Sequence, residues 1–121
     1  MVILDANMIL RYLLNDNQEM ADQAEQYLNS ENAFVTIEVI AEVVYVLKSV
    51  YSLKRNAIAD TVKGFLNLAD CREMDVVRVA LDTFAAHNLD FVDCVLYGYN
   101  RVKGIQIGTF DKKLLKLIAE H

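Results

Sequence analysis

The sequence predicts an α/β domain with a central parallel sheet that helices cover on both faces. Short apolar runs typical of buried strands, such as residues 2–4 and 33–36, alternate with segments in which apolar residues recur at helical spacing. Strands that alternate with helices of roughly 10 to 15 residues are typical of parallel sheets. The 121 residues are 55% hydrophobic, enough for a sizeable core without disulfides or a structural metal, so we expect a single domain over residues 1–121.

The first half of the chain is predicted to contain two strands, each followed by helix. Residues 2–4 are too few for a helix, and helical spacing begins after Asp5. The run Asp16-Asn17-Gln18-Glu19 has the pattern of a capping box with Asp16 as the N-cap, and predicts a second helix. Residues 33–36 are the second strand, and a helix capped by Thr36 continues to about Tyr51. The apolar stripes of these three helices are Ile9, Tyr12 and Leu13; Met20, Ala24, Tyr27 and Leu28; and Ile37, Ile40, Ala41, Val44 and Leu47.

The second half is predicted to be mostly helical. Residues 54–68 and 76–87 each place their apolar side chains on one face, as amphipathic helices do. A brief edge strand over 71–74 rests on Cys71 and Met74 alone. The remaining predicted elements are a helix over 90–101, a strand over 105–107 closed by Gly108 and Thr109, and a helix over 112–120.

Composition predicts a soluble, cytoplasmic protein. No apolar run approaches the roughly 18 residues that span a bilayer, and the first residues lack the basic segment of a signal peptide. Cys71 and Cys94 form no CxxC motif and have only two histidines as possible companions. We therefore expect buried free thiols rather than a zinc site.

Acidic residues outnumber basic ones, and the excess lies in the first half of the chain. The totals are 17 Asp and Glu against 12 Lys and Arg, a net charge of −5; residues 1–60 hold 9 acidic and 4 basic side chains, and residues 61–121 hold 8 of each. This balance argues against a protein that holds nucleic acid by charge alone, which needs a positive surface. It is compatible with an acidic pocket that binds a divalent cation.

Two acidic residues follow predicted strands. Asp5 ends the first strand and Asp111 follows the last one, so both are expected at the edge of the sheet where open parallel sheets bind ligands. In the alternative interpretation, Asp5 is only the N-cap of the next helix.

Two further pairs of acids lie on predicted helices. Glu38 and Glu42 are four residues apart and share one face of an otherwise apolar helix. Asp90 and Asp93 lie at a helix start, where an N-cap and a first-turn anion are favoured without any function. Four carboxylates that converged on one strand edge would repel each other, and a bound cation would remove that cost.

Carboxylate ligands without His or Cys suit Mg²⁺ or Mn²⁺, which commonly engage substrate phosphates. The predicted chemistry is phosphoryl transfer to water, in which the metal lowers the pKa of bound water and neutralises charge on the leaving oxygen. The four glycines form neither a P-loop nor a GxGxxG motif, and no serine has the sequence context of a nucleophile.

Four segments resemble the motifs of PIN-domain proteins, in particular the VapC toxins of toxin-antitoxin pairs, in the family's usual order over essentially the whole chain. They are residues 4–14 (LDANMILRYLL), 41–47 (AEVVYVL), 91–96 (FVDCVL) and 108–114 (GTFDKKL). The resemblance implies a three-layer PIN-like fold with a central parallel sheet. Four or five strands are expected, because the family often has a further strand after the fourth motif, whereas a helix is predicted there in this sequence.

The resemblance also implies a metal-dependent ribonuclease that uses Mg²⁺ or Mn²⁺. The implied catalytic and metal-binding acids are Asp5, Glu42, Asp93 and Asp111, with Asn7 and Thr109 in support. Asp5 and Asp93 match the family's strongest metal ligands. Glu38 and Asp90 do not match its invariant positions, and we expect a solvated helix side chain and an N-cap there.

Substrate and partners follow from the same resemblance, which implies cleavage of single-stranded stretches of transfer or ribosomal RNA. Candidates for phosphate contacts are Arg11, Lys54, Arg55, Arg101, Lys103, Lys112 and Lys113. The family implies a homodimer and a small antitoxin whose C-terminal segment covers the active site. A mean hydropathy of +0.20 also favours contact with another chain.

Two alternatives from other classes stay open. A phosphoacceptor receiver domain has a similar length and acidic strand ends, but it resembles a chain with paired acids after the first strand, and here Ala6 follows Asp5. A non-catalytic PIN-like scaffold that binds protein or RNA would not need all four acids.

Overall fold

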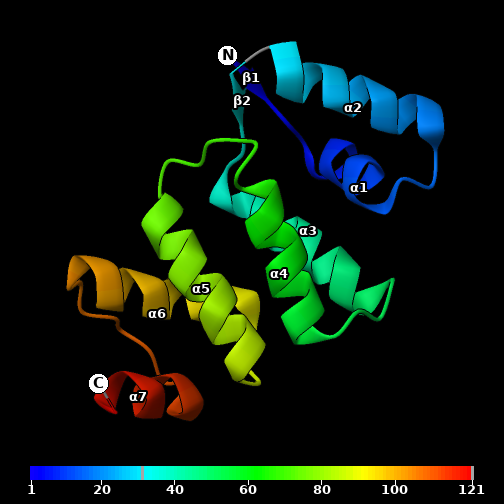
Figure 1. Cartoon of the computed structure of the whole chain (residues 1–121). Helices are drawn as coiled ribbons and strands as arrows, with labels where there is room; N and C mark the ends of the chain where they lie inside the picture. Colours follow the sequence, from blue (N-terminus) through cyan, green and yellow to red (C-terminus); the bar gives the residue numbers. More distant parts are fainter. Residues whose placement is uncertain (31, 121) are drawn as a thin grey trace.

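A small parallel sheet and a larger set of helices make up the fold (Figure 1). The structure, a computed structural model, describes residues 1–30 and 32–120. In chain order the elements are β1 (Val2–Ile3), α1 (Ala6–Leu14), α2 (Gln18–Ser30), β2 (Ala33–Phe34), α3 (Ile37–Ser49), α4 (Arg55–Phe65), α5 (Met74–Ala86), α6 (Phe91–Lys103) and α7 (Lys112–Ala119). The predicted order of helices is confirmed.

The sheet is parallel, as predicted. Val2 pairs with Ala33 and Ile3 with Phe34, and the crossover between the two strands contains α1 and α2. A single residue extends the sheet beyond β2, because the Asp70 backbone bonds to Ala33 and Val35 at 2.9 and 2.8 Å. Within the described residues the sheet thus has two strands and one isolated bridge.

The prediction of four or five strands is not confirmed in the described part of the chain. Residues 105–107 form no strand there; Ile105 is 49% exposed, and its carbonyl accepts a hydrogen bond from the Asn100 side chain at 3.0 Å. Residues 71–74 also form no strand, since α5 already begins at Met74. The alternation of apolar and polar residues predicts which side chains share a face of a strand, but a strand forms only where it pairs with a neighbouring strand. Neither of these described segments pairs with the sheet.

Helix caps follow the predicted chemistry with one correction. The Thr36 hydroxyl accepts the Val39 N–H at 3.2 Å, which confirms it as the N-cap of α3. The prediction that Asp16 caps α2 is wrong, because Asn17 accepts the Met20 N–H instead at 3.1 Å. The Asp16 carboxylate instead forms a two-oxygen ion pair with Arg11, both contacts at 2.8 Å.

One hydrophobic core runs from Leu4 to Leu117 and is built mainly from α3, α4, α5 and α6. Both cysteines are buried free thiols, as predicted, and burial raises the pKa of Cys94 to about 12. Figure 1 places α1 and α2 to one side of the strands and α7 at the opposite end of the molecule. None of the described helices is both long and apolar enough to span a membrane.

The packing of α5 against α6, the most extensive between described elements, depends on a glycine. A Cβ atom added at Gly98 would lie 2.7 Å from the Val76 carbonyl oxygen, whereas one added at Gly64 on α4 would meet nothing within 4 Å. The absence of a side chain at Gly98 therefore sets the distance between the two helices.

We predict opposite effects of alanine at these two helical glycines. Gly98→Ala should lower the free energy of unfolding by about 1–3 kcal/mol, because the helices must move apart. Gly64→Ala should raise it by about 0.5–1 kcal/mol, because alanine loses less backbone entropy on folding. Denaturant unfolding of both variants measures this, and a Gly98→Ala protein as stable as the parent would contradict the close approach.

Candidate active site

The loop between α5 and α6 is held in place by Arg55 at the start of α4. One guanidinium nitrogen donates to the carbonyls of Phe84, His87 and Leu89 at 3.0, 2.7 and 2.8 Å. The other nitrogen lies 3.3 Å from the Asn88 side-chain oxygen, and the guanidinium stacks 4.2 Å from the centre of the Phe84 ring. This clamp fixes the segment that leads into α6.

The first turn of α6 carries two of the acidic residues. Asp90 is the N-cap residue by its backbone, as expected, although its side chain makes no capping bond. Asp93 lies in the first turn and is half-buried. Burial, followed by the negative charges of Asp111 and Asp90, raises the pKa of the Asp93 carboxyl above its usual range.

The start of α7 brings a third acid to the same place. Asp111 caps α7, because its Oδ1 accepts the Leu114 N–H at 2.8 Å. Thr109 holds the turn before it: its hydroxyl accepts the Asp111 N–H at 3.0 Å. Together with Asp90, Asp93 and the loop at Asn88, Asp111 lines a cavity of about 400 Å³.

Asp5 and Glu42 do not line this cavity. Asp5 is exposed and caps α1, with its Oδ1 2.8 Å from the Met8 N–H, and Glu42 is exposed on α3. Asn7 is exposed on α1. Among residues 1–30 and 32–120, no three acidic, histidine or cysteine side chains lie close enough together to hold one metal ion.

The structure thus brings together Asp93 and Asp111 but not the full set of four acids. The expectation that Asp5 and Asp111 share a sheet edge required a strand over 105–107, and the described segment does not pair with the sheet. Asp111 is therefore placed by α7, next to the start of α6, rather than by a strand.

The carboxylate oxygens of this cavity are the type of ligand that hard divalent cations such as Mg²⁺ prefer. The cavity offers carboxylate oxygens, and Asp111 commits only one oxygen to its cap. Burial, and after it the negative charges of Asp111 and Asp90, raises the pKa of Asp93, and a cation bound there would offset both the burial cost and the repulsion. Asp93 and Asp111 are the residues that could hold it, with Asp90 adjacent.

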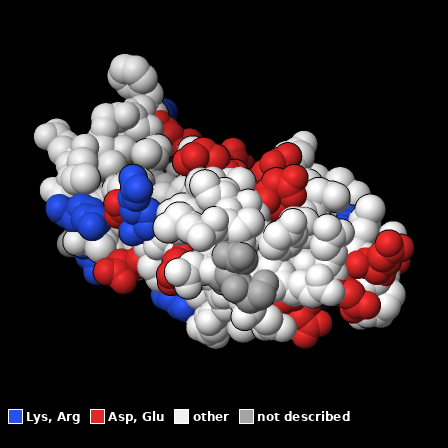
Figure 2. Space-filling model, turned by 90° about the horizontal axis from the view of Figure 1, so that it is seen from above, with Lys and Arg blue, Asp and Glu red and all other residues white. Residues whose placement is uncertain are grey.

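The basic residues predicted to contact phosphate have different surroundings. Arg11 is paired with Asp16, Arg55 holds the loop described above, and Lys103 lies 3.4 Å from Glu73. Lys54 and Arg101 are exposed, whereas Lys112 and Lys113 line the cavity of Asp93 and Asp111. Acidic side chains are spread over the face seen in Figure 2, including the end that α2 forms.

Sequence reasoning missed two residues beside this site, His87 and Lys116. Both line a second cavity that shares Asn88, Leu89 and Lys113 with the first. Lys116 lies three residues after Lys113 and four after Lys112, and this spacing indicates that the three side chains share one helix face. Nothing in the sequence around His87 pointed to this position.

The raised pKa of Asp93 predicts a pH-dependent stability. In the folded chain the charged carboxylate is disfavoured, so its cost is absent below the ordinary pKa of about 3.8 and fully present above the raised folded value. Without metal, Asp93→Asn should therefore raise the melting temperature at pH 7 by a few degrees, and the gain should disappear as the pH falls below about 4. Thermal unfolding monitored by circular dichroism across this pH range measures it.

Asp75 in the first turn of α5 provides a matched control. Asp75→Asn removes only a favourable interaction with the helix dipole, and should leave the melting temperature unchanged or lower it. If Asp93→Asn also lowers the melting temperature at pH 7, the cost inferred for the charged Asp93 carboxylate, from burial and then from its acidic neighbours, is wrong.

Comparisons with known proteins identify the family of this chain. The PIN domain family model matches residues 2–120. A curated relative, "VapC ribonuclease" from Aquifex aeolicus (strain VF5), is 28% identical over 125 residues, covering 97% of this chain and 92% of that protein. No solved structure matches. The match over almost the whole chain takes away the support for a receiver domain and shows that the protein belongs to the PIN-domain family.

Proposed function

We propose that this protein is a metal-dependent endoribonuclease toxin of a toxin-antitoxin pair, which hydrolyses phosphodiester bonds in RNA. The observation that carries the proposal is the pair Asp93 and Asp111, which two helix N-termini present to one cavity. Membership of the PIN-domain family and the likeness to a VapC ribonuclease support it. Transfer RNA or ribosomal RNA is the proposed substrate.

The proposed metal ligands are Asp93 and Asp111. Asp5 and Glu42, which lie outside their cavity in this structure, are proposed to complete the site by moving closer when the metal binds. When bound, Mg²⁺ or Mn²⁺ supplies a water of lowered pKa and neutralises charge on the leaving oxygen. Thr109 fixes the direction of Asp111 by accepting its backbone N–H. Asn7 supports Asp5 from the same first turn of α1.

Residues around the acids are proposed to bind the RNA backbone. Lys112 and Lys113 line the cavity beside Asp111 and can hold a phosphate near the metal ligands. The N–H groups at the starts of α6 and α7 also favour an anion. Catalysis in this proposal needs no histidine base.

Contact with other chains is part of the proposal. Val44, Tyr45, Phe91 and Val92 are among the residues that line a mostly apolar groove of about 300 Å³, and Tyr45 and Val92 are 68% and 60% exposed. Apolar surface of this kind marks protein contacts. We propose that an antitoxin covers the active site, that the protein forms a homodimer, and that it acts in the cytoplasm as a single PIN domain.

Loss of a metal ligand should abolish cleavage. Asp93→Asn and Asp5→Asn should each reduce the rate of RNA cleavage by roughly 100-fold or more, because a weakened metal site loses both the activated water and charge neutralisation. The assay incubates purified protein with a pool of transfer and ribosomal RNA in Mg²⁺ or Mn²⁺, and with chelator. Discrete fragments that require both metal and the acids are expected.

Glu38 and Glu42, one turn apart on α3, allow a matched comparison. Glu42→Gln should reduce cleavage strongly and Glu38→Gln should not, although both remove one negative charge from an exposed position of the same helix. If Asp93→Asn protein cuts RNA as fast as the parent, the proposed site is wrong. Absence of cleavage in every condition would favour the non-catalytic scaffold.

A further inference from the structure

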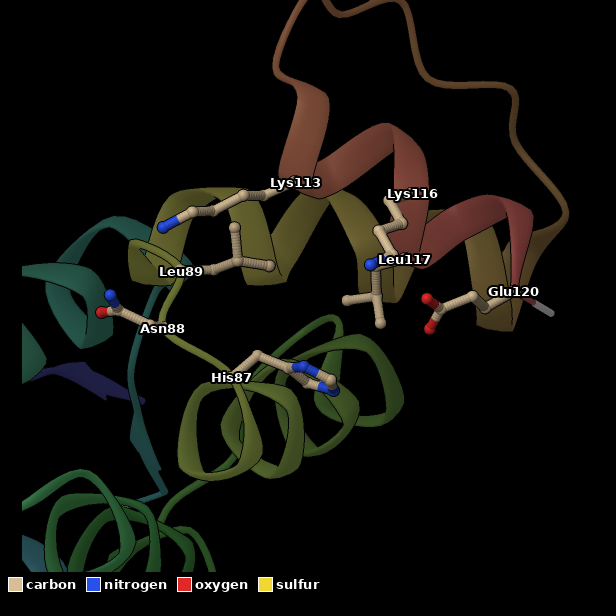
Figure 3. Close-up of a pocket in the computed structure, with 7 residues that line it drawn as sticks. All are labelled: His87, Asn88, Leu89, Lys113, Lys116, Leu117 and Glu120. Carbon is tan, nitrogen blue, oxygen red and sulfur yellow. The ribbon is translucent and has the colours of Figure 1, made fainter.

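A second cavity lies between the α5–α6 loop and α7, next to the acidic one (Figure 3). Its volume is about 280 Å³. The lining residues are His87, Asn88, Leu89, Lys113, Lys116, Leu117 and Glu120. Two buried leucines form its apolar wall, and the polar side chains around them are exposed.

The polar lining is mostly cationic or able to donate hydrogen bonds. Lys113 and Lys116 come from one face of α7, and His87 comes from the end of α5 on the opposite wall. Figure 3 shows Lys113 reaching over Leu89, while the imidazole of His87 points toward the space below Leu117. Glu120 is the one acid among these lining residues.

Both lysines lack a counter-ion in the described part of the chain. Lys63 and Lys103 pair with acids at 2.6 and 3.4 Å, whereas Lys113 and Lys116 pair with none of the described residues. In a chain with a net charge of −5, two unpaired lysines on one cavity wall leave a local positive charge.

This second cavity adjoins the acidic one. Asn88, Leu89 and Lys113 line both, so Lys113 stands between the acids and Lys116. Two of the shared residues, Asn88 and Leu89, belong to the loop that Arg55 fixes through the carbonyls of His87 and Leu89, so this part of the shared wall is preorganised.

We propose that this second cavity is a phosphate subsite for single-stranded RNA, in which Lys113, Lys116 and His87 hold the phosphodiester next to the one that is cleaved. The inference rests on the proposed function, since it takes the acidic cavity as the cleavage site. The acids at Asp93 and Asp111 repel the strand, and cations one nucleotide away offset that repulsion. Leu89 and Leu117 give the ribose an apolar surface to lie on.

Binding without cleavage tests the subsite directly. The probe is a short fluorescent 2′-O-methyl RNA strand, titrated with the full chain in chelator and followed by anisotropy. Lys113→Gln and Lys116→Gln should each weaken binding about threefold to tenfold. Each should also make the negative slope of the log binding constant against log salt concentration less steep by about 0.7. Glu120→Gln should strengthen binding, because it removes the opposing charge.

Lys63→Gln on α4 is the control that changes net charge equally outside the cavity, and it should leave affinity and salt slope unchanged. The proposal is overturned if Lys116→Gln binds as the parent does, or if Lys63→Gln weakens binding as much as Lys116→Gln. His87→Gln replaces the imidazole ring with an amide that still donates a hydrogen bond. It should therefore weaken RNA binding less than either lysine substitution.

The failure of this inference differs from failure of the proposed function. If RNA is cut with metal but the lysine variants bind normally, the subsite is wrong and the ribonuclease stands. If the lysine variants lose binding but no condition gives cleavage, the RNA-binding cavity stands and the proposed catalysis fails.

Discussion

The guanidinium of Arg55 ties the middle of the chain to the loop on which the site is built. It bonds to the Phe84 carbonyl and stacks on the Phe84 ring at the end of α5, and it bonds to the carbonyls of His87 and Leu89, which fixes the loop just before Asp90, the N-cap of α6. A hydrogen bond to a charged donor contributes about 1.5–3 kcal/mol. The position of Asp93, and of the wall shared by the two cavities, therefore depends on a residue far away in sequence.

Much of the helical fold could be predicted from the sequence because local signals agree with each other. A hydroxyl residue followed by an apolar stripe predicts an N-cap at Thr36, and Thr36 does cap α3. The two first strands pair in parallel, as predicted. Strand number could not be predicted in the same way. Residues 105–107 have the apolar alternation of a strand, but pairing depends on a distant edge that no local pattern specifies.

The candidate site was predictable as a set of residues but less so as an arrangement. Carboxylates after strands or at helix starts are visible in the sequence, and Asp93 and Asp111 do meet in one cavity. Asp5 and Glu42 lie outside it in the described structure: Asp5 is the N-cap of α1 and Glu42 lies on α3, and no local sequence pattern specifies how close these helices come to α6 and α7. The role of Arg55 in the loop, and the place of His87, come from tertiary contacts.

The central claim is that the acids at the starts of α6 and α7 bind a divalent cation. Paramagnetic broadening of backbone amide signals by Mn²⁺ in nitrogen-15-labelled protein tests it most directly. Signals of Asp93 and Asp111 should broaden first, with those of Asp5 and Glu42 next. Those of Glu19, Asp22 and Glu25, the acids of α2, should stay sharp. Broadening that begins on α2, or that is equal over all exposed acids, would contradict the account.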